Sequence, residues 1–347
     1  MTAAFKLGTF SWGGGSPFAG LVVDDRVYAL GDLQSLLSGT GHTLRGTDSL
    51  LGLMQDWESN FAALRAAVAQ PEFADLPSTP LAALRVEVPI RPTQIFCAGA
   101  NYREHVIEIM MNEDPAGAGA HLSREERREQ AARTMDERAA TGVPFVFVKT
   151  AAALNRAEGE IVLPGDVTKP DWELELAVVI GRKARRVNRA DALDYVAGYT
   201  VANDLSARER QYRTDMKVIG ADWLAAKCAP GFLPLGPLIT PKAFVPDAEN
   251  LRLTLTLNGQ TMQDSCTDDM VFGIARLIEY VSSLTELWPG DVLLTGSPPG
   301  NASHHGRFLQ PGDVLEGEIE GLGRQHHVCV AEETDTETRA PTPAMSV

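Results

Sequence analysis

Residues 172–181, WELELAVVIG, restrict the fold of this chain more than any other segment. Apolar and β-branched residues run into a glycine, which is typical of a β-strand. Because successive side chains of a strand point to opposite faces, Glu173 and Glu175 share one face and Leu174 and Leu176 the other. The strand soon becomes wholly apolar, so burying two neighbouring carboxylates is costly. One of them would take up a proton unless a positive charge lies between them.

A divalent cation between the two glutamates would remove that cost. Oxygen ligands alone suit Mg²⁺, Mn²⁺ or Ca²⁺ better than Zn²⁺. The same alternation is also compatible with an edge strand that carries two solvated glutamates. This segment by itself leaves both interpretations open.

The charge of the chain argues against several classes of partner. Its formal net charge is −15 over 347 residues, which disfavours a nucleic-acid partner and an anionic membrane surface. An acidic small substrate is compatible with this charge, because a bound cation reverses the local field. No apolar run is long enough to cross a membrane, and the first residues lack the apolar core of a signal peptide. Four scattered cysteines without zinc spacing complete the expectation of a cytoplasmic protein with no nucleic-acid or membrane partner.

The chain is expected to divide into three parts. A hairpin over residues 18–30 and a helix over residues 57–70 indicate a small N-terminal domain. A run of prolines over residues 77–92 is the candidate linker. A polar, acidic C-terminal tail is expected to be disordered. The predicted parts are residues 1–88, 89–331 and 332–347.

The second part is predicted to be rich in strands. Residues 258–259, Asn-Gly, carry a hairpin signal, and residues 272–287 form the clearest helix. Long strands with irregular connections and few crossover helices argue against a Rossmann or TIM layout and favour a β-rich α+β fold. The expected strands cover residues 94–98, 145–149, 173–180, 195–201, 251–257, 291–295 and 314–319.

Residues 104–141 are predicted to be helical. Ser123 and Glu126 form a capping-box pattern that opens a highly charged helix. Gly117 and Gly119 precede this helix and are candidate hinges. The segment 109–142 is therefore interpreted either as a mobile lid or as a plain surface helix.

The beginning of this helical segment carries a candidate general base. His105 and Glu108 are three residues apart and share a helix face. A carboxylate beside an imidazole raises its basicity and fixes its tautomer, as a general base requires. An ordinary pair on a helix surface has the same spacing.

Further polar residues lie near predicted strand ends. Asp204 is either a helix cap or a third metal carboxylate, because two glutamates and one aspartate are a normal Mg²⁺ shell. Arg208 and Gln211 follow closely and could reach a substrate carboxylate.

Lys227 lies among apolar residues, either as a snorkelling surface residue or as a desolvated cation near an anionic substrate. In residues 293–300, small hydroxyl and glycine residues would let a ligand approach closely.

Together these segments resemble the fumarylacetoacetate hydrolase superfamily. The resemblance is carried by ELEL and VVIG, then NDLSAR at 203–208, LTGSP at 294–298 and LQPGDV at 309–314, in this order. Residues 101–108, N-Y-x-x-H-x-x-E, match the lid motif of its smaller bacterial-type members. The resemblance extends from Pro92 to Gly323, whereas residues 1–88 resemble the variable N-terminal part only loosely.

This resemblance implies roles for individual residues. It implies a β-rich mixed roll with a small N-terminal α/β domain, usually found as a homodimer. It makes Glu173, Glu175 and Asp204 ligands of Mg²⁺ or Mn²⁺. It makes His105 and Glu108 the water-activating pair and Lys227 the lysine that stabilises negative charge. The substrate contacts that it implies are Tyr102, Arg208, Gln211, Thr295 and Ser297.

The implied activity is hydrolysis of a C–C bond in a small oxo-acid. The substrate would be a 2,4-dioxo, acylpyruvate-like acid from aromatic or sugar-acid catabolism, cleaved through a metal-stabilised enolate. A decarboxylase, isomerase or hydratase of related oxo-acids would use the same scaffold. A non-catalytic binding protein is disfavoured, because binding alone does not require a base.

Two departures from the family pattern concern the substrate more than the metal. Residues 295–305 form a longer polar turn than the family usually has, and the segment 109–142 is longer than in compact members. The pairs His304-His305 and His326-His327 could suggest zinc, but without a cysteine or acid at ligand spacing they are interpreted as loop histidines.

Overall fold

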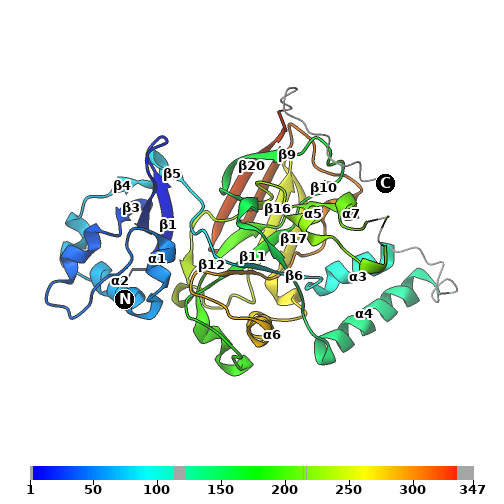
Figure 1. The fold of residues 1–347 in the computed structure, drawn as a ribbon, viewed down its shortest axis with the longest axis horizontal. Coiled ribbons are helices and arrows are strands. Elements are labelled where there is room, and N and C mark those ends of the chain that lie inside the picture. The colour runs from blue at the N-terminus through cyan, green and yellow to red at the C-terminus, as the bar shows by residue number, and fades with distance from the viewer. Residues whose placement is uncertain (1–2, 113–121, 214, 216, 334–347) are drawn as a thin grey trace.

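A computed structural model describes residues 3–112, 122–213, 215 and 217–333 of this chain. A small N-terminal sheet lies at one side, and two larger sheets with most of the helices make up the rest (Figure 1). The prediction of a β-rich α+β fold is confirmed. No described helix has both the length and the apolar character needed to cross a membrane.

The N-terminal sheet has the order β4-β3-β2-β1-β5. Its predicted hairpin is confirmed: Asp24 and Asp25 both have positive φ, at 46° and 60°, as a tight hairpin turn requires. The proline-rich run predicted as a linker supplies the two short edge strands β4 and β5. Proline is tolerated at a sheet edge, where Pro80 lies in β4. The elements are β1 Lys6–Ser11, β2 Phe18–Val23, β3 Arg26–Ala29, β4 Thr79–Pro80, β5 Arg85–Val86, α1 Leu50–Met54 and α2 Trp57–Val68.

A six-stranded sheet with the order β15-β12-β11-β18-β6-β7 forms the centre of the molecule. Its pairs are antiparallel except for β18 with β6, which is parallel. Every residue of β11 and β12 is buried, so these two central strands are covered on both faces. The strands are β6 Ile95–Gly99, β7 Phe145–Lys149, β11 Leu174–Ile180, β12 Val196–Asn203, β15 Thr240–Pro241 and β18 Val292–Leu294.

A five-stranded sheet with the order β17-β16-β19-β20-β9 packs against one face of the central sheet. The approach is close at Gly317, where an added Cβ would lie 2.6 Å from Leu174 Cδ1. Asn258 and Gly259 turn with positive φ between β16 and β17, which confirms the predicted Asn-Gly hairpin. The strands are β9 Glu158–Leu163, β16 Arg252–Leu257, β17 Gln260–Cys266, β19 Val314–Ile319 and β20 Gly323–Ala331.

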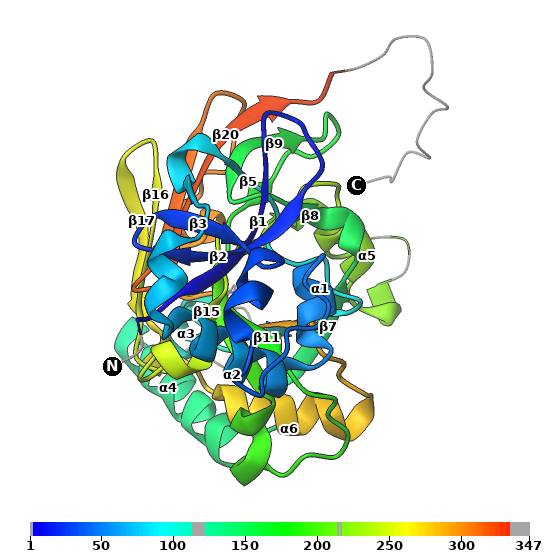
Figure 2. The same ribbon diagram turned by 90° about the vertical axis from the view of Figure 1, so that its left-hand side faces the viewer.

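The side chains of β11 point alternately to its two faces, and each face packs into a different hydrophobic cluster. Leu174, Leu176 and Val178 belong to the cluster between the two large sheets. Ala177 and Val179 point to the opposite face, where they pack with N-terminal residues. The N-terminal sheet lies in front of that face when the molecule is turned by 90° (Figure 2). Glu173 and Glu175 fall in the same alternation as Ala177 and Val179, as the sequence predicted.

The helical segment after β6 consists of two helices, α3 Arg103–Asn112 and α4 Arg124–Thr141. The predicted capping box is confirmed: Ser123 Oγ accepts from Glu126 N, and Glu126 Oε2 accepts from Ser123 N. The helix α4 lies along the outside of α3 (Figure 1), with which it shares a small apolar cluster. Gly117 and Gly119 are outside the described residues, and the lid remains a prediction.

The remaining elements are short or shorter than expected. The predicted helix over residues 272–287 is confined to α6 Ile274–Leu284, because the backbone at Thr285 is extended. Of the predicted tail, residues 334–347 lie outside the described part of the chain. The other elements are β8 Leu154–Asn155, β10 Pro170–Asp171, β13 Ser206–Ala207, β14 Leu233–Pro234, α5 Trp223–Lys227 and α7 Ala302–His305.

Candidate metal centre and catalytic site

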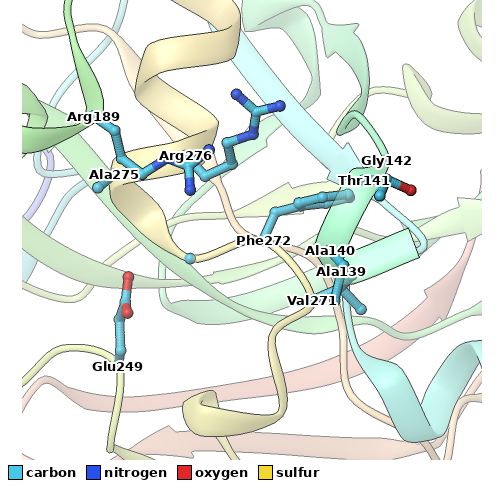
Figure 3. Close-up of a pocket in the computed structure, with 11 residues that line it drawn as sticks. Ala139, Ala140, Thr141, Gly142, Arg189, Glu249, Val271, Phe272, Ala275 and Arg276 are labelled. Carbon is cyan, nitrogen blue, oxygen red and sulfur yellow. The ribbon is translucent and has the colours of Figure 1, made fainter. Parts of the chain in front are cut away.

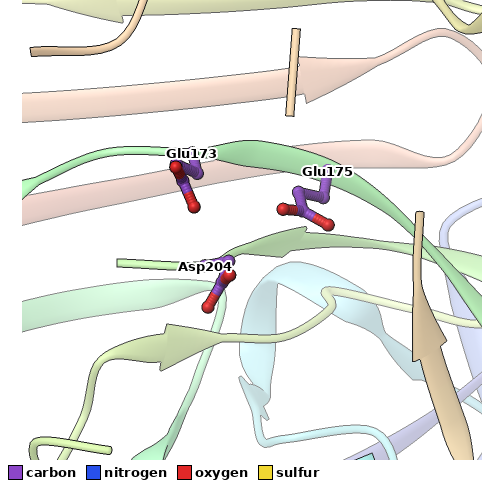
Figure 4. Close-up of side chains that lie close together, drawn as sticks. All are labelled: Glu173, Glu175 and Asp204. Atoms are coloured by element: carbon purple, nitrogen blue, oxygen red, sulfur yellow. The ribbon is translucent and has the colours of Figure 1, made fainter. Parts of the chain in front are cut away.

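Three carboxylates meet where β11 begins and β12 ends. Leu174 pairs with Asn203 in the sheet, and Asp204 N donates to Glu173 O at 2.8 Å. Glu173 and Glu175 extend from the same side of their strand toward the segment that carries Asp204 (Figure 4). One oxygen of each of the three carboxylates lies within 4.8 Å of the other two, and all three residues are buried. Adjacent strands thus assemble a compact acidic cluster.

The environments of the two glutamates differ. Burial, and then the charges of Asp204 and Glu173, raise the pKa of Glu175 well above the usual range. One hydrogen bond, from Gly296 N at 2.7 Å, opposes this shift. Burial would also raise the pKa of Glu173, but the charges of Arg208 and Lys227 outweigh it and hold that pKa well below the usual range.

Two cations offset the negative charge of the carboxylate cluster. Lys227 is buried, and its Nζ contacts Glu173 and Asp204 Oδ2, the latter at 2.5 Å. Lys227 is therefore a desolvated cation and not a snorkelling surface residue, and its role beside an anionic substrate remains a prediction. Arg208 donates through Nε to Asp171 Oδ2 at 2.7 Å and through its other nitrogen to Glu173. Arg208 thus already neutralises Glu173, in addition to its predicted role as a substrate contact.

Lys149 is a third cation beside the cluster, and sequence reasoning missed it. Its Nζ donates to Asp204 Oδ1 at 2.6 Å and to the carbonyls of Leu205 and Phe232 at 3.0 and 2.8 Å. Its side chain is fully buried. The available signal was a lysine at the end of the apolar strand FVFVK, which is unusual for a residue type that is rarely buried unpaired.

We expect replacement of Lys149 by methionine to lower the free energy of unfolding by about 3 kcal/mol, because it removes the buried donor to Asp204 Oδ1 and to two carbonyls. Urea unfolding with EDTA present measures this effect. Lys183→Met is the matched control, since Lys183 forms an exposed pair with Glu286 worth about 0–1 kcal/mol. Equal losses in the two variants would contradict a structural role for Lys149.

The predicted general-base pair lies on α3, but its members have different neighbours. His105 is only 7% exposed, and burial lowers its pKa from the ordinary value of 6.5. Within the described part of the chain, its Nδ1 has no hydrogen-bond partner. Glu108 Oε2 instead lies 3.2 Å from His304 Nδ1 and accepts from Gly300 N at 3.3 Å. A direct His105–Glu108 bond therefore remains a prediction.

The other predicted substrate contacts have different surroundings. Tyr102 is fully buried at the start of α3. The Thr295 hydroxyl donates to Leu176 O at 3.1 Å, and Ser297 Oγ accepts from Gln263 Nε2 at 3.0 Å. Gln211 is only half buried and contacts the exposed Tyr212 at 3.3 Å. Their substrate roles remain predictions.

Two amides position this part of the chain. The sequence placed Asn101 in the motif of residues 101–108 but gave it no role, and sequence reasoning did not find Gln263. Asn101 donates to Thr295 O at 2.8 Å and to Phe272 O at 3.0 Å, so it joins the start of α3 to the turn after β18. Gln263 bonds to Ser297 and accepts from Leu174 N at 3.1 Å. Both are buried, and each partner is far away in the sequence.

The alternative zinc interpretation gains no support. Among residues 3–112, 122–213, 215 and 217–333, the three carboxylates form the one cluster of histidine, cysteine or acidic side chains close enough to hold an ion. His304 pairs with Glu108, and His326 lies 3.9 Å from Glu316. The carboxylate cluster offers only oxygen atoms, so it fits a hard divalent cation such as Mg²⁺ or Mn²⁺.

A cavity of about 310 Å³ lies elsewhere, between the end of α4 and the start of α6 (Figure 3). Arg189, Glu249 and Arg276 contribute its charged groups. Glu249 accepts from Ile274 N at 2.6 Å, and both arginines pair with Glu279. None of the predicted site residues lines it, so it is not the candidate active site.

Most of this chain is similar to one known protein family. Residues 94–330 match the family described as Fumarylacetoacetate (FAA) hydrolase C-terminal. A mitochondrial oxaloacetate tautomerase, FAHD2A of Bos taurus, is 34% identical over 278 residues, which are 79% of this chain and 77% of that protein.

Solved structures show the same architecture. A putative HpcE protein from Mycobacterium smegmatis superposes with a TM-score of 0.70 at 29% identity, covering 94% of this chain and 99% of that one. A maleylpyruvate hydrolase from Sphingobium sp. SYK-6, solved with manganese(II) and pyruvate, superposes with a TM-score of 0.66 at 25% identity. This match covers 94% of this chain and all of the other.

Proposed function

This chain belongs to the fumarylacetoacetate hydrolase family, and we propose that it is a divalent-metal-dependent hydrolase of 2,4-dioxo, acylpyruvate-like acids. The observation that carries the proposal is the buried cluster of Glu173, Glu175 and Asp204. A related structure holds manganese(II) and pyruvate, an ion and an oxo-acid of the kinds proposed here.

The three carboxylates would hold Mg²⁺ or Mn²⁺. The bound cation would supply Lewis-acid stabilisation of negative charge on the substrate oxygens. Lys227 contacts Glu173 and Asp204, and Arg208 contacts Glu173. Both cations would offset further negative charge as the reaction proceeds. The homodimer implied by the family resemblance is part of this proposal.

His105 is the group best suited to move a proton. Because burial lowers its pKa, its imidazole is neutral near pH 7 and can accept a proton from water. The resulting hydroxide would attack the carbonyl distant from the carboxylate. Cleavage of the adjacent C–C bond would release a carboxylic acid, and protonation of the leaving carbon would give a 2-oxo acid such as pyruvate. The reaction consumes one water.

A second candidate is keto–enol isomerisation of a related oxo-acid. The name of the bovine relative, an oxaloacetate tautomerase, favours it. Isomerisation moves a proton from carbon to oxygen without attack by water, so it needs a base beside the substrate but no activated water. Decarboxylation and hydration would also use the same carboxylates.

A product assay distinguishes these reactions. Purified protein with Mn²⁺ would be incubated with acylpyruvates, oxaloacetate and hydroxymuconates, and products would be identified by NMR. We expect equal amounts of pyruvate and a carboxylic acid from an acylpyruvate, loss of activity with EDTA, and recovery with added Mn²⁺ or Mg²⁺. Interconversion of oxaloacetate tautomers without C–C cleavage would favour the second candidate. Full turnover in the metal-stripped protein would exclude both.

A further inference from the structure

The short helix α7 is anchored to the metal centre. Asn301 Oδ1 caps it by accepting from His304 N at 3.1 Å. Ala302 N donates to Asp171 Oδ1 at 2.6 Å, and the other oxygen of Asp171 binds Arg208, which contacts Glu173. The position of α7 is therefore coupled through two side chains to a proposed metal ligand.

Gly300, which precedes the cap residue Asn301, reinforces the anchor. Gly300 has φ of +91°, and an added Cβ would lie 2.1 Å from Met262 O. Its carbonyl accepts from Trp172 Nε1 at 3.0 Å. The backbone at Gly300 is thus held in one conformation by packing and a buried hydrogen bond, and its N–H points to Glu108.

The segment that contains α7 also contacts Glu108. His304 Nδ1 and Gly300 N both contact the same carboxylate oxygen, Oε2, at 3.2 and 3.3 Å. Among the described residues, no hydrogen bond to Oε1 of Glu108 is present, and Nδ1 of the buried His105 also has no partner. The carboxylate is thus held through Oε2, and a bond from Oε1 to Nδ1 of His105, one helical turn away, would complete the predicted pair.

We propose that His304 is a positioning residue, which holds Glu108 so that its second oxygen orients His105 for proton transfer. This inference rests on the proposed function, because it gives His304 a part in the action of the general base. His304 lies in the turn in which this chain departs from the pattern usual in the family. The helix α7 would then link the carboxylate cluster and the base, so that both keep one relative position.

The surroundings of the pair are charged and partly open. Glu108 and His304 line a cavity of about 500 Å³ together with Met111, Arg124, Glu125 and Arg128. The His304 side chain is 40% exposed and that of Glu108 23% exposed. An exposed pair of this kind contributes only about 0–1 kcal/mol to the free energy of unfolding. If His304 had only a structural role, replacing it would therefore have little effect on kcat.

Four variants test the proposal: His304→Ala, His304→Asn, Glu108→Gln and the double variant His304→Ala/Glu108→Gln. Loss of a partner that orients a metal ligand costs about 10-fold to 100-fold. By analogy, His304→Ala, which removes a partner of the general-base pair, should lower kcat about tenfold with little change in KM. His304→Asn places an amide N–H near the position of Nδ1 and should recover most of kcat. In the Glu108→Gln background, His304→Ala should have almost no further effect, because coupled residues are not additive.

His326→Ala is the matched control, since it removes another histidine beside a glutamate, Glu316, on the surface. It should leave kcat unchanged. An unchanged kcat in His304→Ala, an equal loss in both Glu108 backgrounds, or no recovery with His304→Asn would overturn the proposal. Mn²⁺ affinity should be the same in all of these variants, so a weaker metal site would also argue against positioning of the base.

A measurement without turnover separates this inference from the proposed function. In ¹⁵N-histidine-labelled protein without substrate, the ring signals of His105 should shift in His304→Ala and stay in place in His326→Ala. If no oxo-acid is converted but the His105 signals shift, the positioning contact stands and the proposed reaction fails. If an acylpyruvate is cleaved but the signals and kcat do not respond to His304, the reaction stands and the positioning role fails.

Discussion

Replacing Glu173, Glu175 or Asp204 by the corresponding amide is expected to lower metal-dependent turnover by about 10³-fold or more. Loss of a metal's charge stabilisation amounts to several kcal/mol, and each 1.4 kcal/mol changes the rate about tenfold. The measurements are kcat for the cleaved substrate and the Kd for Mn²⁺ by calorimetry. Each variant should bind Mn²⁺ more weakly than the parent protein. Full Mn²⁺ affinity in all three variants would place the ion elsewhere.

The stabilities of these variants should differ from one another even though the activities fall together. Glu175→Gln removes a carboxylate whose pKa is raised by burial and by Asp204 and Glu173, and the amide oxygen can still accept from Gly296 N. Its free energy of unfolding at pH 7 without metal should therefore equal or exceed that of the parent. Glu173→Gln removes one of the two negative partners of Arg208 and of Lys227, which keep Asp171 and Asp204. It should lower the free energy of unfolding by about 2 kcal/mol, the scale of a hydrogen bond to a charged group.

The pH dependence of the free energy of unfolding checks the direction of the stability changes in Glu175→Gln and Glu173→Gln. The pKa of Glu175 is raised on folding, so its ionisation costs stability as the pH rises above the ordinary value of 4.5. The pKa of Glu173 is lowered on folding, so its contribution is present above that value and is lost as the pH falls below it. The advantage of Glu175→Gln and the loss in Glu173→Gln should both shrink when urea unfolding is repeated at acidic pH. Equal stability of the two variants at pH 7 would contradict this assignment.

The fold could be predicted where one face of a strand is apolar. The alternation in β11 indicated its burial and the side to which its glutamates point, because a strand has a period of two residues. The strand β20 was not predicted, since it buries Gln325 and His327. These two side chains bond to the carbonyls of Val201 and Arg156, so polar residues occupy positions at which a sequence pattern requires apolar ones.

The sequence predicted the parts of the candidate site that are formed by residues close together in the sequence. It predicted less well the contacts between segments that are far apart in the sequence. Glu173 and Glu175 are two positions apart, so their proximity follows from the strand alone. Lys149 reaches Asp204 across 55 residues of chain, and no local pattern indicates such a pairing. The contact between Glu108 and His304 could not be predicted for the same reason, because it depends on where the turn after β18 lies relative to α3.

His105→Asn is expected to lower kcat by about 10²–10⁴-fold, the usual range for loss of a general acid or base. Affinity for Mn²⁺ and for oxalate, a small dicarboxylate probe, should persist, because a base acts in the transition state and adds little to ground-state binding. Calorimetry of the variant with Mn²⁺ and then oxalate measures this. His42→Ala, which removes an exposed histidine of the N-terminal part, is the control and should keep the parent kcat.

The pH profile gives His105 a second, independent signature. A base must be deprotonated to act, and burial lowers the pKa of this imidazole below 6.5. In the parent protein kcat/KM should therefore stay high through neutral pH and fall only at a pH below 6.5, where His105 takes up a proton. The residual activity of His105→Asn should lack this acidic fall. If the variant keeps both kcat and the acidic fall, another group is the base, and His105 is a buried histidine that packs against the carboxylate cluster without acting on the substrate.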